Sequence, residues 1–89
     1  MVKRDMTIVN SSGLHARPAA ALVKLAMKFS SKINLQKQGL EVSAKSIMGV
    51  MTLGADKGSS LTVVADGEDE EDALEQICNF IENKFDEKE

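Results

Sequence analysis

The sequence predicts an α+β fold in which amphipathic helices cover one face of a four-stranded sheet. Four short segments alternate apolar and polar residues, two longer segments repeat apolar residues at helical spacing, and a short apolar segment lies between a serine and a glycine. The predicted order is β-α-β-β-α-β-α, with an antiparallel or mixed sheet. With 89 residues and 43% hydrophobic side chains, we expect one domain, 1–89, with one modest core.

The first strand is predicted at residues 2–9, because Val2, Met6 and Ile8 alternate with polar residues before the loop NSSG. A helix is predicted from about Ala16 to Phe29. Its buried stripe comprises Ala19, Leu22, Val23, Ala26 and Phe29. A second face, basic and partly apolar, carries Arg17, Ala20, Lys24, Met27 and Lys28. The alternation then resumes in residues 33–36 and 40–42 around the pair QG, which predicts a hairpin.

The segment KSIMGVMTLG predicts a short helix capped by Ser46 and ended by Gly54. So short a helix cannot turn all its apolar side chains towards one core, so we expect some of this apolar surface to be exposed. The apolar residues concerned are Ile47, Met48, Val50, Met51 and Leu53. Exposed methionines suit a binding patch, whereas in small proteins methionine more often fills the core. The residues alone leave both interpretations open.

A fourth strand is predicted up to Gly67, with Leu61, Val63 and Ala65 on one side and Thr62, Val64 and Asp66 on the other. The last helix begins within EDEEDALEQICNFIENKF, with carboxylates in its first turn, where the helix dipole favours them. Its buried stripe comprises Ala73, Leu74, Ile77, Cys78, Ile81 and Phe85. The acidic run lacks the central glycine and ligand spacing of a calcium loop, so we interpret it as a helix start.

Composition narrows the function classes. With a net charge of −3 and no tryptophan or tyrosine, the chain has few platforms for bases and little attraction for phosphate backbones, so we expect no nucleic-acid partner. The one cysteine, Cys78, is expected to be a buried structural thiol. No segment is long and apolar enough to be a membrane span or secretory signal, which predicts a cytoplasmic protein without membrane insertion. One histidine and one cysteine make no familiar zinc site, and we expect neither metal nor cofactor.

The stretch GLHARPAAAL holds the only histidine, His15, and the only proline, Pro18. If His15 is the N-cap, the free amides of the first turn and the helix dipole point to where an anion on its ring would lie. Pro18 has no N–H, but in the first turn of a helix this N–H would have no partner within the helix. Arg17 brings a guanidinium that can neutralise phosphoryl oxygens. The positive helix end also favours an uncharged, nucleophilic imidazole near neutral pH. A buried structural histidine and the base of a small hydrolase are the alternatives.

Together, GLHARPAA and KSIMGVMTLG resemble HPr, the histidine-containing phosphocarrier family of the bacterial sugar phosphotransferase system, over nearly the whole chain. The resemblance implies an open-faced β-sandwich: a four-stranded antiparallel sheet covered by three helices. It also implies that His15 accepts a phosphoryl group on Nδ1 from enzyme I and passes it to enzyme IIA, with help from Arg17. Such a protein is a carrier and not an enzyme.

The second motif is similar to that of HPr from low-GC Gram-positive bacteria. This similarity implies that Ser46 is phosphorylated by an HPr kinase/phosphorylase and that the modified protein acts with a catabolite control protein. It favours binding for the exposed methionines. The implied docking patch comprises Ala20, Lys24, Met27, Ile47, Met48 and Met51. A monomer is expected. Ala20 and Lys37 stand where relatives often have a hydroxyl residue and an aromatic, which bears on partner preference. A purely regulatory module acting through Ser46 is the alternative.

Overall fold

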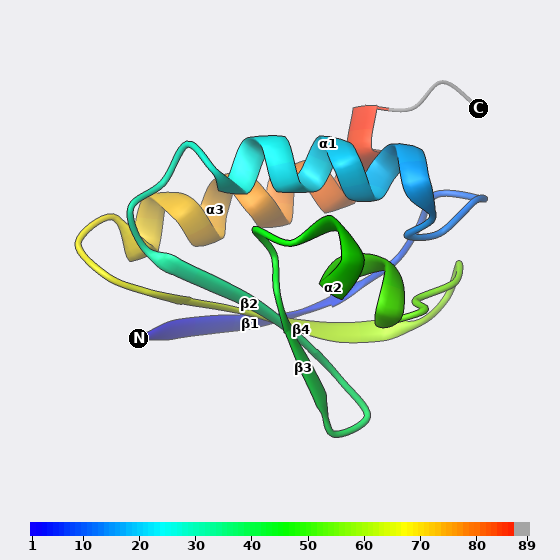
Figure 1. Ribbon diagram of the computed structural model, residues 1–89, viewed down its shortest axis with the longest axis horizontal. Coiled ribbons are helices and arrows are strands. Elements are labelled where there is room, and N and C mark those ends of the chain that lie inside the picture. Colours follow the sequence, from blue (N-terminus) through cyan, green and yellow to red (C-terminus); the bar gives the residue numbers. More distant parts are fainter. Residues whose placement is uncertain (87–89) are drawn as a thin grey trace.

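The computed structural model describes residues 1–86 and shows one sheet with its helices on a single face (Figure 1). The strands are β1 (Val2–Thr7), β2 (Lys32–Lys37), β3 (Leu40–Ser43) and β4 (Ser60–Asp66). The helices are α1 (Ala16–Ala26), α2 (Ile47–Thr52) and α3 (Glu70–Glu82), followed by a short turn, η1 (Lys84–Asp86). The strands lie in the order β1-β4-β2-β3, and every pair is antiparallel. The predicted open-faced α+β sandwich is confirmed, and the sheet is antiparallel, not mixed.

The core lies between the sheet and the helices. Alternating residues of each strand point towards the helices, as the period of two requires. Ile8, Leu35 and Val63 from the sheet side and Leu22 and Ile77 from the helices are all 1% exposed or less. Val64 departs from the prediction, because it points to the open face and is still buried. It lies on the central strand β4, between Lys3 and Asn34 in register, and neighbours on both sides limit its exposure.

The β2–β3 hairpin turns at Gln38 and Gly39, as predicted. Both residues have positive φ, 49° and 84°, which is the conformation of a type I′ turn. The right-handed twist of the flanking strands matches this turn, so the register pairs Lys37 with Leu40 across it.

Two predicted boundaries are wrong by two or three residues. β1 ends at Thr7 and not at residue 9, because Ile8 already pairs with the loop before β4, its N–H donating to the Ser59 carbonyl. α1 ends at Ala26 and not at Phe29, because the amides of Lys28 and Phe29 bind carbonyls three residues back instead of four. Phe29 remains buried in the loop that follows.

The last helix also ends before the sequence pattern does. All six predicted stripe residues are buried, but α3 ends at Glu82 and the chain continues with three left-handed residues. Phe85 therefore reaches the core through the turn η1, where its ring meets Phe80 edge to face at a centroid distance of 5.6 Å. The pattern predicted the burial of Phe85 but not the backbone that achieves it.

Candidate functional site

His15 lies at the junction between the β1–α1 loop and the first turn of α1. It is the N-cap of α1, with extended backbone (φ −86°, ψ −168°), and its carbonyl accepts the Ala19 amide at 2.9 Å. The side chain is exposed and makes no capping hydrogen bond. A buried structural histidine is therefore excluded, and the predicted N-cap position is confirmed.

The first turn of α1 has the chemistry of an anion site. The leading N–H groups of a helix have no partner within it, and their dipoles add a partial positive charge. No acidic residue lies in this turn, Arg17 is exposed beside it, and Pro18 is buried against the core. An anion attached to the ring of His15 would thus meet N–H groups and one guanidinium with no carboxylate from the helix itself.

A shallow pocket of about 200 Å³ adjoins His15. Its lining comes from both sides of the site: Ser12, Leu14, His15, Met51, Gly54, Ala55 and Asp56. Asp56 is the residue that sequence reasoning missed. It lies 41 positions after His15 and belongs to no motif, so only the pairing of the two loops, through the Leu14 amide and the Ala55 carbonyl at 2.8 Å, brings it to the site.

The short helix α2 is built as predicted. The Ser46 hydroxyl accepts the Gly49 amide at 3.1 Å, which satisfies one free N–H of the first turn. At the other end Gly54 has a φ of 63°, the left-handed conformation that glycine adopts at low cost. Ser46 itself is exposed. A hydroxyl that caps α2 is thus also accessible to a modifying enzyme.

The apolar residues of α2 divide between core and surface. Val50 and Leu53 are buried, whereas Ile47, Met48 and Met51 are 44%, 76% and 41% exposed. The methionines of α2 are therefore surface residues and not core filler. A patch of this kind, formed by flexible side chains, is typical of a protein-binding surface.

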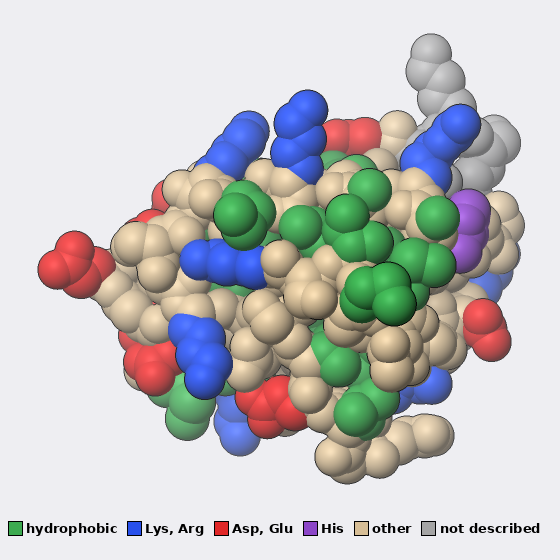
Figure 2. Space-filling view, viewed as in Figure 1, with side chains coloured by type: hydrophobic (Ala, Val, Ile, Leu, Met, Phe, Trp, Pro, Cys, Tyr) green, Lys and Arg blue, Asp and Glu red, His purple; other side chains and the backbone are tan. Residues whose placement is uncertain are grey.

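The exposed face of α1 continues this patch, because α1 packs against α2. Ala20, Lys24 and Met27 are all exposed, as the sequence predicts, and Met27 is 63% exposed. Figure 2 shows hydrophobic side chains gathered over α1 and α2, with lysine or arginine side chains around them and the histidine at one edge. The six predicted docking residues are therefore all exposed on two helices that pack together, and His15 caps one of these helices.

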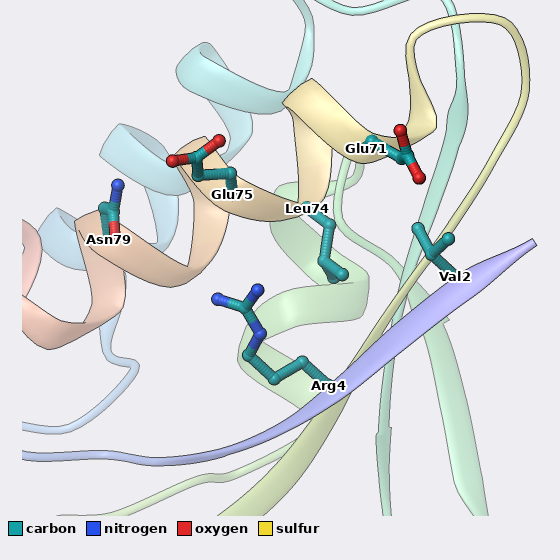
Figure 3. Close-up of a pocket in the computed structure, with 6 residues that line it drawn as sticks. All are labelled: Val2, Arg4, Glu71, Leu74, Glu75 and Asn79. Atoms are coloured by element: carbon teal, nitrogen blue, oxygen red, sulfur yellow. The ribbon is translucent and has the colours of Figure 1, made fainter.

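A second groove, of about 460 Å³, lies between β1 and α3 (Figure 3). Arg4 extends from β1 towards α3 there, so it faces the helices. Burial raises the pKa of the nearby Cys78 thiol, and the positive charge of Arg4 only partly opposes this shift. Cys78 is fully buried, as predicted for a structural thiol. The groove contains none of the residues predicted for the site.

Two absences concern residues 1–86, the part of the chain that the structure describes. No cluster of three or more histidine, cysteine or acidic side chains that could hold a metal ion occurs in this range. In the same range no helix has the length and hydropathy needed to cross a membrane. The site around His15 consists of the imidazole ring, the N-terminus of α1, the Arg17 guanidinium, the nearby Asp56 and an apolar surface.

Comparison with known proteins agrees with this geometry. A family model described as "PTS HPr component phosphorylation site" matches residues 2–83. The chain is 47% identical to the phosphocarrier protein HPr of Cupriavidus necator over 89 residues, all of both chains. Among solved structures, HPr of Thermoanaerobacter tengcongensis is 46% identical, covers both chains fully and superposes with a TM-score of 0.95. A dimeric HPr of that organism is 47% identical, with a TM-score of 0.78 over 98% of this chain and all of the other. The chain therefore belongs to the HPr family of phosphocarrier proteins of the phosphotransferase system.

Proposed function

We propose that His15 is the phosphoacceptor of this carrier and that it takes its phosphoryl group from a phosphohistidine of enzyme I. The observation that supports this most directly is the exposed His15 side chain at the N-cap of α1, next to the first turn, whose leading N–H groups have no partner within the helix. The lone pair of His15 Nδ1 attacks phosphorus while the N–P bond of the donor breaks, and the electron pair of that bond stays on the donor ring. In the second transfer the phosphorylated His15 is the donor, and a histidine of enzyme IIA is the acceptor in the same kind of step.

Charge compensation and positioning account for the chemistry of this step. The phosphoryl oxygens on His15 carry negative charge, which the amide dipoles of α1 and the planar fork of Arg17 stabilise. Two docked proteins hold donor and acceptor rings in line, so the reaction needs little more than alignment. The protein returns unchanged after each cycle, so it acts as a carrier and not as an enzyme, and this role requires no cofactor.

Docking involves the apolar patch and its basic rim: Ala20, Lys24, Met27, Ile47, Met48 and Met51. Both enzyme I and enzyme IIA need the ring of His15, so both must approach this same face. The exposed thioethers adapt to two different partners, and Lys24 with Arg17 favours partners whose contact surface is acidic. We expect the chain to act as a cytoplasmic monomer of one domain, although a 47% identical HPr is known as a dimer.

Ser46 adds regulation to transfer. An HPr kinase/phosphorylase phosphorylates its exposed hydroxyl, and the modified protein binds a catabolite control protein. Phosphate at this N-cap adds charge beside Ile47 and Met48, where an acidic enzyme I surface would dock. Modification at Ser46 therefore lowers the rate of phosphorylation at His15.

Mass spectrometry after separate phosphorylation tests both sites. With enzyme I and phosphoenolpyruvate we expect one acid-labile phosphate on His15, absent in His15→Asn and unaffected in Ser46→Ala. With the kinase and ATP we expect one acid-stable phosphate on Ser46, retained in His15→Asn. A phosphate on Ser46 alone would identify a purely regulatory module instead. Turnover without any partner protein, abolished in His15→Asn, would identify a hydrolase.

A further inference from the structure

The side chain of Asn10, five residues before His15, is completely buried. Buried amides are costly unless they are hydrogen-bonded, so the partners of this side chain matter. Its Nδ2 donates to the Gly13 carbonyl at 2.9 Å and to the Ser12 hydroxyl at 3.2 Å. The backbone carbonyl of Asn10 accepts the Gly13 amide at 3.3 Å. One residue thus binds both polar backbone groups of Gly13.

The peptide unit between Gly13 and Leu14 is held on both edges. Its carbonyl accepts from Asn10 Nδ2, and its N–H donates to the Ala55 carbonyl at 2.8 Å. A peptide unit is planar, so fixing its two polar groups fixes its orientation. Leu14 is buried directly after it, and His15 follows as the N-cap of α1.

We infer that Asn10 is a positioning residue for His15. The His15 side chain makes no capping hydrogen bond, so the backbone that precedes it sets the point from which its ring extends. Asn10 and Ala55 hold that backbone from opposite sides, which keeps this point at the N-terminus of α1. This inference rests on the proposed role of His15 as phosphoacceptor.

The role of Asn10 can be separated from simple stability with a matched variant. Ser31 is the other buried polar residue among residues 1–86. Ser31 directly precedes β2. The first residue of β2, Lys32, pairs with Asp66, and this pair lies at the end of the sheet where β1 begins. The His15 loop follows the other end of β1. Ser31→Ala therefore removes buried hydrogen bonding without touching the loop, and serves as the control.

We would compare Asn10→Ala, Asn10→Ser and Ser31→Ala as acceptors of phosphate from enzyme I, each at a temperature where it is more than nine-tenths folded. We expect kcat of both Asn10 variants to fall by roughly ten- to a hundredfold, with KM within about twofold of wild type. Ser31→Ala should retain the kcat of wild type. In amide hydrogen exchange, Leu14 should lose protection in the Asn10 variants and keep it in Ser31→Ala.

Wild-type kcat in the folded Asn10 variants would overturn the inference, as would an equal fall in Ser31→Ala. If Asn10→Ala does not fold, Asn10→Ser, which keeps a shorter polar group, decides by the same criteria. Failure of wild type itself to take phosphate on His15 would refute the proposed function, but not the inference that Asn10 holds the Gly13–Leu14 peptide unit. In that case retained protection of the Leu14 amide in both Asn10 variants would independently refute the inference that Asn10 holds this peptide unit.

Discussion

The carboxylate of Asp69 receives the backbone N–H of Ser31 at 2.9 Å, across 38 positions of sequence. It also accepts the Ser30 amide at 3.0 Å and the Ser31 hydroxyl. Asp69 is the N-cap of α3, but its side chain makes no capping bond to that helix. The carboxylate instead joins the loop before α3 to the loop between α1 and β2, two segments that no strand pairing connects directly.

Acid should weaken this connection. The hydrogen bonds from Ser31 and then Ser30 lower the pKa of Asp69 from its ordinary 3.8 to about 2. A carboxyl with a lower pKa in the folded state stabilises the fold fully above its unfolded value and loses that contribution as pH falls towards the folded one. We therefore expect the Tm of wild type to fall between about pH 4 and pH 2 more steeply than that of Asp69→Asn, measured by circular dichroism.

At pH 7 Asp69→Asn should have a lower Tm than wild type, because a neutral amide is a weaker acceptor than a carboxylate. Asp66→Asn is the control. Among residues 1–86, the exposed Asp66 carboxylate is paired with the N-terminal amine at 3.6 Å and not with a loop amide. Parallel Tm curves for wild type and Asp69→Asn between pH 4 and pH 2 would contradict the assignment of this acid sensitivity to Asp69.

Position 13 requires glycine because of both its backbone conformation and its close neighbours. Its φ is +66°, and a Cβ there would lie 2.6 Å from the Ala55 carbonyl oxygen, which belongs to the backbone and cannot swing away. Gly39 also has positive φ, +84°, but nothing lies within 4 Å of its Cβ position. We expect Gly39→Ala to cost about 1–2 kcal/mol from strain alone. Gly13→Ala should cost about 1–3 kcal/mol more, because the clash is added.

Denaturant titration of both glycine variants measures this difference in the free energy of unfolding. Gly13→Ala should also reduce phosphorylation of His15 by enzyme I, whereas Gly39→Ala at the hairpin tip should not. Equal stability of the two variants would show that the Ala55 carbonyl moves aside and that the two loops can separate at little cost.

The sequence predicted the elements of the fold far better than the contacts between them. Local patterns are sufficient for His15 at a helix start, Ser46 as a cap and the I′ turn at Gly39, because each depends on a few neighbouring residues. The proximity of Asp56 to His15 and the hydrogen bonds from Ser31 to Asp69 depend on which loops meet in space. A carboxylate in an acidic helix start gives no signal that its partner lies 38 positions away, so the same residues predicted only a helix dipole effect.

Met48 should contribute to docking and not to stability. It is 76% exposed, and surface substitutions away from special features change stability by less than about 0.5 kcal/mol. We expect Met48→Ser to raise KM for phosphorylation by enzyme I by about tenfold, equivalent to about 1.4 kcal/mol of lost binding. Leu40→Ser is the matched control, since Leu40 is an exposed apolar residue (42%) on β3, outside the patch. An unchanged KM in Met48→Ser would contradict the proposal that α2 is part of the docking surface.

Substitutions at Ser46 separate its two roles. Ser46→Ala removes the acceptor of the Gly49 amide and should lower the free energy of unfolding by about 0.5–2 kcal/mol. It leaves no new charge, so phosphorylation of His15 should proceed at the wild-type rate. Ser46→Asp keeps a good N-cap, and its negative charge suits the helix start, so its stability should match or exceed that of wild type.

The same Ser46→Asp change should slow transfer from enzyme I, because it places a carboxylate beside Ile47 and Met48, where an acidic partner surface approaches. Ser60→Asp adds the same charge on an exposed serine of β4, outside the patch, and should leave transfer unaffected. Because the effect is electrostatic and arises at an exposed surface, raising the salt concentration should reduce the difference between Ser46→Asp and wild type. Stopped-flow transfer rates at low and high salt would measure this. A Ser46→Asp protein that is stable and transfers as fast as wild type at low salt would rule out charge repulsion as the means by which Ser46 regulates His15.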